Sequence, residues 1–109
     1  MRQSQTAVLE RGIILDKEIA TEPFETAWAK EARWFVQFLE SSDVTVSMRT
    51  QISADGLVWV DHEDRPVEGP ARQVLTAPVR DFGHWLRLVV TPTGGTGTPL
   101  TRIYLALKE

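Results

Sequence analysis

Residues 43–60 read DVTVSMRTQISADGLVWV, and the alternation of apolar and polar residues in the first part of this stretch decides the fold class. An extended chain would place Val44, Val46 and Met48 on one face, followed by Thr50 and Ile52, with the intervening polar residues on the other face. A side-chain period of two is typical of a half-buried strand. The stretch therefore predicts a β-strand over residues 43–53.

A chain reversal is expected directly after this strand, at Asp55 and Gly56. Aspartate hydrogen-bonds to nearby backbone groups in turns, and glycine tolerates a positive φ. The LVWV that follows, residues 57–60, consists largely of β-formers and predicts the return strand of a hairpin. Asp55 and Gly56 are accordingly predicted to be structural turn residues. Trp59 is predicted to have a structural role as well.

Most of the remaining chain also has β patterns. Strands are predicted for residues 72–77 (RQVLTA), 84–91 (HWLRLVVT) and 100–109, where Ile103, Leu105 and Leu107 share one face. Two short strands are expected on either side of Gly12. The segments at residues 61–70 and 92–99 are rich in proline and glycine and are expected to be surface loops.

Residues 24–39 admit two interpretations. The spacing of Phe24, Trp28 and Ala32, continued by Phe35, Val36 and Leu39, fits an amphipathic helix. Trp34, Val36 and Phe38, however, alternate with more polar neighbours in a segment dense in aromatic and β-branched residues, which favours a strand. A strand over residues 32–39 is the prediction, and the helix is the alternative.

Length and composition indicate one globular domain. The chain has 109 residues, of which 42% are hydrophobic and 25% charged, so it is long enough for one hydrophobic core and too short for two. Seven or eight short strands separated by turn signals predict an all-β fold, an antiparallel β-sandwich or jelly roll, with no helix longer than about three turns.

Charge and cysteine content exclude several function classes. The net charge is −3 and no basic run is present, so nucleic acid is not expected as a partner. The absence of cysteine rules out disulfides, thiolate zinc sites and cysteine nucleophiles. No stretch of about 18 apolar residues and no secretory signal pattern occurs, which predicts no membrane contact and a cytoplasmic location.

The ionisable residues do not match a known catalytic or metal-binding motif. Residues 61–64 (DHED) concentrate carboxylate and imidazole groups but lack the spacing of an EF-hand or an H-E-x-x-H site, so a solvated acidic loop is expected. A small hydrolase using His62 or His84 against a hydroxyl such as Ser53 is the weakest hypothesis, because no nucleophile elbow is present. The sequence predicts no enzyme activity, no metal and no cofactor.

Aromatic residues are the better candidates for intermolecular contacts, because large rings serve cores, interfaces and sugar sites alike. The candidate interface or ligand-contact residues are three tryptophans and one histidine: Trp28, Trp59, His62 and Trp85. Arg33, Arg49 and Arg87 lie within predicted strands and are expected to form ion pairs or to stack on aromatic rings.

The order of these motifs resembles that of small β-sandwich proteins encoded among phage structural genes, such as capsid decoration and head-fibre proteins. The resemblance covers residues 28–109 and rests on ARWFVQF, SADGLVW, LRLVVT, the glycine-threonine loop and YLALKE. The S-x-D-G-x-x-W corner is also similar to that of discoidin-like, galactose-binding-like sandwiches. The resemblance implies a jelly-roll subunit or adhesion module rather than an enzyme, and it implies a virion as the other expected location.

Two function hypotheses from different classes follow. The first is a non-enzymatic assembly protein that buries apolar and aromatic surface in a homo-oligomer, with a capsid or another particle surface as its partner. A trimer is preferred, because the decoration proteins that the chain resembles often sit on threefold positions. The alternative is a carbohydrate-binding module in which loop residues around Trp59 and His62 hold a glycan.

Overall fold

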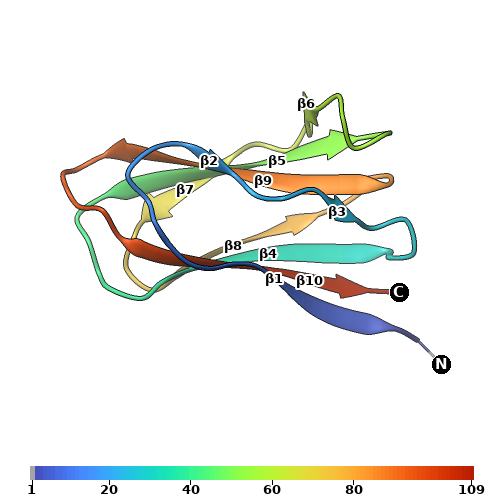
Figure 1. The fold of residues 1–109 in the computed structure, drawn as a ribbon, viewed down its shortest axis with the longest axis horizontal. Helices are drawn as coiled ribbons and strands as arrows, with labels where there is room; N and C mark the ends of the chain where they lie inside the picture. The colour runs from blue at the N-terminus through green and yellow to red at the C-terminus, as the bar shows by residue number, and fades with distance from the viewer. Residues whose placement is uncertain (1) are drawn as a thin grey trace.

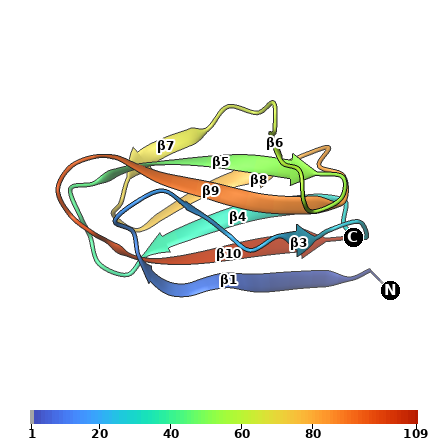
Figure 2. The ribbon, with the colours of Figure 1, turned by 45° about the horizontal axis from the view of Figure 1, so that its top comes forward.

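The computed structural model describes residues 2–109 as ten strands in two antiparallel sheets packed face to face (Figures 1 and 2). These residues contain no helix, and so no helix that could span a membrane. The all-β sandwich predicted from the sequence is therefore confirmed. The helix alternative for residues 24–39 is wrong, because the alternating residues Trp34, Val36 and Phe38 point into the space between the sheets.

The first sheet, sheet A, has four strands. Their order across the sheet is β1 (Ser4–Ile14), β10 (Leu100–Lys108), β4 (Glu31–Phe38) and β8 (Val74–Val79). Both chain termini lie at the same end of this sheet (Figure 1). The last strand of the chain forms as predicted, and it is central in the sheet, paired with both β1 and β4.

The second sheet, sheet B, is built around two long strands, β5 (Thr45–Ser53) and β9 (Trp85–Gly94), which pair along their length. Two-residue strands β2 (Ile19–Ala20) and β3 (Phe24–Glu25) flank β9. On the other side, β6 (Val60–Asp61) and β7 (Val67–Pro70) flank β5. Short strands thus form both edges of sheet B, an arrangement that limits edge-to-edge pairing with other chains.

The core fills the space between the two sheets. Its fully buried side chains come from alternate positions of the long strands, including Trp34, Val36, Met48, Leu86, Leu88, Ile103 and Leu105. The indole N–H of Trp34 donates to Thr50 Oγ1 across the sandwich at 3.0 Å. This bond satisfies the polar atom of the largest buried side chain, which would otherwise be costly to bury.

The N-terminal segment differs from expectation. Instead of two short strands around Gly12, one continuous strand, β1, runs from Ser4 to Ile14. Its pairing with β10 shifts register between Val8 and Glu10 and again between Glu10 and Ile13. Such irregularities let a strand bend while keeping its partner, so the glycine did not end the strand.

Three loops also have boundaries that differ from those expected from the sequence. Residues 57–59 do not form a strand, because the backbone N–H groups of Leu57 and Val58 donate to the Asp55 carboxylate instead of to a neighbouring strand. The expected loop at residues 61–70 contains β7, which pairs with the first half of β5. The glycine-threonine loop is shorter than expected, because β9 continues to Gly94.

Candidate functional site

A crevice of about 580 Å³ opens at one end of the sandwich, between the β5–β6 loop (residues 54–59) and the β8–β9 loop (residues 80–84). Its lining is mostly apolar, with Ile52, Val58, Trp59 and Phe82, and it includes the polar side chains of Asp55, Asp81 and His84. We call this the end crevice. Concave, largely apolar sites with a few polar groups are typical of binding sites.

A compact set of hydrogen bonds fixes the β5–β6 loop. Ser53 Oγ accepts from the backbone N–H of Gly56 at 2.9 Å and donates to Asp55 Oδ1 at 3.0 Å. Asp55 Oδ1 also accepts from the N–H groups of Leu57 at 2.9 Å and Val58 at 3.0 Å. The bond from Val58, followed by those from Leu57 and Ser53, lowers the pKa of the Asp55 carboxyl, because each favours its charged form.

Gly56 has the positive φ that the sequence analysis expects there, +79°. A Cβ at this position would also lie 3.2 Å from Cδ2 of Trp85, whose indole packs beneath the turn. The residue is therefore constrained both by its backbone conformation and by a close neighbour. Trp85 is half-buried and packs against the turn at Gly56, so this candidate contact residue has a structural role.

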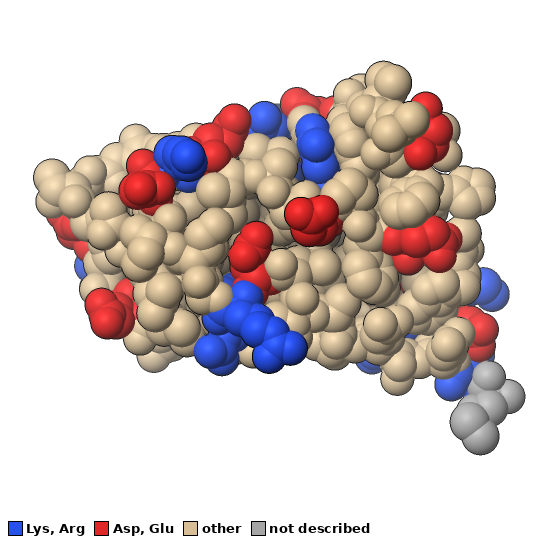
Figure 3. Space-filling model, viewed as in Figure 1, with Lys and Arg blue, Asp and Glu red and all other residues tan. Residues whose placement is uncertain are grey.

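The loop that this bonding holds in place exposes apolar side chains. Leu57 is 81% exposed, Val58 75% and Val60 61%, the three largest values among the exposed large hydrophobic residues of this structure. Figure 3 shows an uncharged protrusion at the corner where Figure 1 places β6 and the β5–β6 loop, with charged side chains on either side of it. We call these three side chains and the adjoining end crevice the apolar end.

Trp59 is held by a cation rather than left free. The guanidinium of Arg87 lies over the Trp59 ring, 4.5 Å from its centroid, and Arg87 Nε donates to Gln51 Oε1 at 2.7 Å. The expected stacking of Arg87 on an aromatic ring is thereby confirmed. One face of the candidate ligand-contact residue Trp59 is covered, and its ring is half-buried.

The polar contacts continue across the outer face of sheet B. Asp61 Oδ1 accepts from Gln51 Nε2 at 2.8 Å and from Arg49 Nε at 3.3 Å, and Arg49 also pairs with Glu18 at 3.4 Å. The bond from Gln51, followed by that from Arg49, lowers the pKa of Asp61. Hydrogen bonds from Thr91 and Arg49 likewise lower the pKa of Glu18. The ion pairing expected of Arg49 is confirmed.

The DHED segment is solvated at its carboxylates, as expected, because Asp61, Glu63 and Asp64 are exposed, but His62 is an exception. Its side chain is buried, and Nε2 is hydrogen-bonded to the carbonyl oxygen of Arg80 in the β8–β9 loop. Nδ1 accepts from the backbone N–H of Asp64 at 3.1 Å, so Nε2 carries the proton and donates to that carbonyl. The ring joins two loops and presents no atom for a ligand at the surface.

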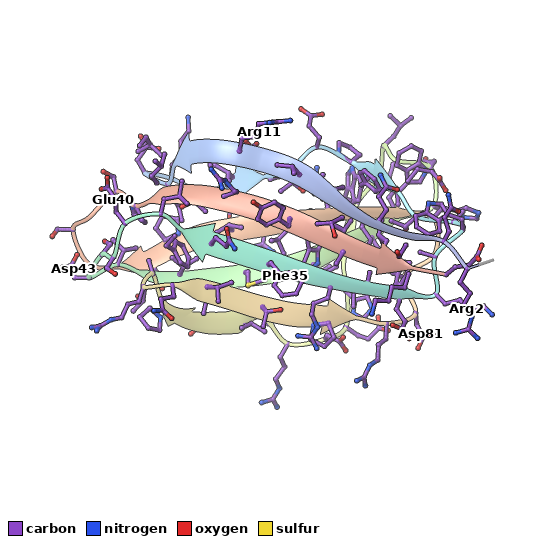
Figure 4. The ribbon with its side chains drawn as sticks, turned by 90° about the horizontal axis from the view of Figure 1, so that it is seen from below. Arg2, Arg11, Phe35, Glu40, Asp43 and Asp81 are labelled. Carbon is purple, nitrogen blue, oxygen red and sulfur yellow. The ribbon has the colours of Figure 1, made fainter. Side chains whose placement is uncertain are left out.

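The β8–β9 loop has special backbone geometry. Asp81, labelled in Figure 4, has a φ of +52°, and Gly83 has a φ of +73°. The backbone carbonyl of His84 accepts from the Thr26 N–H at 2.7 Å, which ties this loop to the segment after β3. Trp28, the remaining candidate contact residue, follows in that segment and packs, half-buried, against the core.

The end crevice brings together Ser53 and His84, the residues of the hydrolase hypothesis, but no hydrogen bond joins their side chains within residues 2–109. Ser53 and His84 both line it, yet every hydrogen bond of Ser53 Oγ within residues 2–109 is to Asp55 or to the turn backbone. The same residues contain no group of three or more His, Asp or Glu side chains placed to hold a metal ion.

Sequence reasoning did not identify Leu57, Val58 and Val60 as functional candidates. Their signal was present, as a run of β-formers directly after an aspartate-glycine turn, but it was interpreted as a paired strand. Phe82 and Asp81 of the facing loop carried no comparable signal, because only the fold brings them next to Val58.

No protein-family model and no curated protein matches this chain. Several solved structures are similar to it at low sequence identity. Dimeric latent PorU from Porphyromonas gingivalis is similar with a TM-score of 0.50 and 12% identity, over 99% of this chain and 13% of the PorU chain. This likeness supports the β-sandwich fold.

Two further structures are similar at lower scores. An exo-β-1,3-galactanase from Phanerochaete chrysosporium has a TM-score of 0.41 and 10% identity, over 98% of this chain and 27% of the galactanase. FLHE has a TM-score of 0.39 and 12% identity, over 98% of this chain and 92% of FLHE. The chain thus spans a small part of the length of PorU and of the galactanase.

Proposed function

We propose that this protein is a non-enzymatic β-sandwich that assembles into a closed homo-oligomer through its apolar end. The observation that carries the proposal is the exposure of Leu57, Val58 and Val60 beside an apolar crevice. Apolar surface in contact with water is unfavourable by about 25 cal/mol per Å², so covering it favours association. Contiguous exposed apolar patches on small domains commonly mark interfaces.

The hydrogen bonds within the β5–β6 loop favour a binding role for its exposed apolar side chains, because they hold the loop in one conformation. The hydrogen bonds of Ser53 and Asp55 and the stacking of Arg87 on Trp59 fix the backbone beneath the exposed side chains. A contact made by a preformed loop loses less conformational entropy on association than one made by a flexible loop.

A second copy of the chain is the occupant that best fits this surface. The apolar loop and the end crevice adjoin at the same end of the molecule, so a rotation axis near this end would bring the loop of each subunit against the crevice of its neighbour. Such a contact closes on itself and does not propagate into fibres. The phage-like order of motifs implies a capsid or another particle surface as the setting, and we propose that role for the oligomer.

The glycan alternative has less support at the position expected for it. His62 is buried and bonded on both ring nitrogens, and Arg87 covers one face of Trp59. A sugar would have to displace these contacts before it could stack there.

Sedimentation equilibrium of the full chain at micromolar concentration tests the proposal. We expect an oligomer, a trimer or another closed number, whereas Leu57→Asp should sediment as a monomer of about 12.3 kDa because burying a charge in an apolar contact is unfavourable. Val74→Asp is the matched control, since Val74 is an exposed valine at the start of β8 and should keep the oligomer. A monomeric wild-type chain, or equal dissociation of both variants, would contradict the proposal.

A further inference from the structure

The outer face of sheet A carries a groove of about 400 Å³ that shares no lining residue with the end crevice. Figure 4 shows this face, with Phe35 near the middle of the sheet. We call it the basic groove. Its side chains come from β4, β8, β10 and the residues beside them: Lys30, Glu31, Arg33, Phe35, Pro78, Arg80, Ala106 and Lys108.

The strand register explains why this face is hollowed. Arg33 on β4 lies between Ala106 on β10 and Pro78 on β8, both of which have short side chains. The neighbouring row across the same face carries the rings of Tyr104 and Phe35. A row with small side chains beside a row with large ones leaves a depression, and Phe35 borders it with an apolar ring.

The charge of the groove is opposite to that of the chain. Four cationic side chains and one carboxylate, that of Glu31, line it, while the whole chain has a net charge of −3. None of the four cations forms an ion pair with another of residues 2–109. They are Lys30, Arg33, Arg80 and Lys108.

The Arg33 side chain is oriented by a hydrogen bond but has no acidic partner within residues 2–109. Contrary to the expectation of an ion pair or a stacked ring, its Nη1 donates to Thr76 Oγ1 at 3.2 Å, and that hydroxyl donates to the Trp34 carbonyl oxygen at 2.8 Å. One hydrogen bond orients the guanidinium and leaves its other N–H groups free to donate. Arginine binds planar carboxylates with two parallel hydrogen bonds.

We infer that the basic groove binds a carboxylate-bearing saccharide of the uronate class. The groove lies on the face of sheet A, and β4 at its centre is hydrogen-bonded to β10 on one side and to β8 on the other, so a ligand over Arg33 meets side chains and no free strand edge. A uronate offers a carboxylate to Arg33 and a C–H face to Phe35. The groove volume lies within the range of about 300–1,000 Å³ that is typical of small-ligand pockets.

Isothermal titration of the full chain with trigalacturonate tests the carboxylate contact. We expect binding that weakens with added salt, is weaker by roughly tenfold or more in Arg33→Gln, and is lost with the fully methyl-esterified trisaccharide. Arg102→Gln is the matched control, because Arg102 is on the outer face of β10 but outside the groove, and it should bind as the wild type does. No binding, equal binding of the ester, or equal loss in both variants would overturn the inference.

A second comparison separates a saccharide from an acidic peptide. Phe35→Leu keeps an apolar side chain but removes the ring face, so it should weaken trigalacturonate binding by roughly fivefold, whereas Tyr104→Leu outside the groove should not. An oligoglutamate peptide should bind more weakly than trigalacturonate and should be insensitive to Phe35→Leu. Tighter binding of the peptide, or indifference of the trisaccharide to Phe35→Leu, would overturn the assignment to a saccharide.

Saccharide binding by the basic groove and assembly through the apolar end can be tested independently of each other. Leu57→Asp should leave trigalacturonate binding unchanged, and Arg33→Gln should leave the sedimentation of the oligomer unchanged, because the two surfaces share no lining residue. Loss of both properties in either variant would contradict the separate assignment of the groove.

Discussion

The apolar end and the basic groove are both exposed surfaces, but they are built in different ways. The apolar end is a loop whose shape depends on a positive φ at Gly56, on the Ser53 and Asp55 hydrogen bonds and on the buried His62. The basic groove consists of side chains that project from regular, paired strands. Changes beneath the apolar end should therefore cost stability, whereas changes in the groove should cost binding alone.

The largest effect is expected from His62→Ala. The substitution leaves a cavity and removes the ring atoms that bond to Arg80 and Asp64, so it should lower the free energy of unfolding by about 2–3 kcal/mol. Urea denaturation measures this loss. His84→Ala, at the exposed histidine of the same end, should change stability by less than about 0.5 kcal/mol. Equal effects would mean that the buried ring does not brace the loops.

Gly56→Ala should have the next largest effect, a loss of about 1–2 kcal/mol, because a Cβ meets both an unfavourable φ and the Trp85 ring. Gly83→Ala is the matched control, since Gly83 has a similar φ of +73° but no atom within 4 Å of the added Cβ. Thermal unfolding of both variants isolates the contact with Trp85. A Gly56 variant that is as stable as the wild type but fails to assemble would make the corner a binding site instead of a brace.

Acid should weaken the apolar end by a smaller amount. The pKa of Asp55 is lowered in the folded chain, so this carboxylate contributes stability that is complete above its unfolded pKa, near 4, and is lost as the pH falls through the lower folded value. Glu18 and Asp61 act in the same direction. The urea concentration at the midpoint of unfolding should decrease as the pH is lowered from 5 to 3. Asp55→Asn, which keeps an acceptor oxygen but does not titrate, should show a shallower fall, and an unchanged slope would refute this role.

Arg33→Gln should have the smallest effect on stability, within about 0.5 kcal/mol of zero, because its guanidinium is exposed and has no acidic partner within residues 2–109. Arg49→Gln is the comparison on the opposite face, where the side chain contacts both Glu18 and Asp61, and it should be the more destabilising of the two. The reverse order in urea denaturation would mean that the groove cations serve the fold.

The long strands could be predicted from the sequence because their side-chain period survives folding. The alternation in the first half of β5, in β10 and around Trp34 in β4 corresponds to the buried and exposed faces. The short strand β7 escaped prediction, because Gly69 and Pro70 are poor β-formers and only its partner β5 makes it a strand. In the same way, Gly12 predicts a break between two short strands, whereas pairing with β10 keeps β1 continuous through its register shifts.

The surfaces could not be predicted, because they depend on contacts between distant segments. The burial of His62 follows from a hydrogen bond to Arg80, and the basic groove exists only once the sheet register places Arg33 beside Pro78 and Ala106. The run of β-formers at Leu57 and Val58 was interpreted as a strand because the sequence does not reveal that Asp55 takes up both N–H groups.

The reactivity of a single thiol at the apolar end tests the central claim most directly. The chain contains no cysteine, so Val58→Cys and the control Val74→Cys each carry one unique thiol. Alkylation of Cys at position 58 should slow markedly as the protein concentration rises into the range in which the oligomer forms, while the rate at position 74 should stay constant. An oligomer in which the thiol at position 58 reacts as fast as in the monomer would contradict assembly through the apolar end.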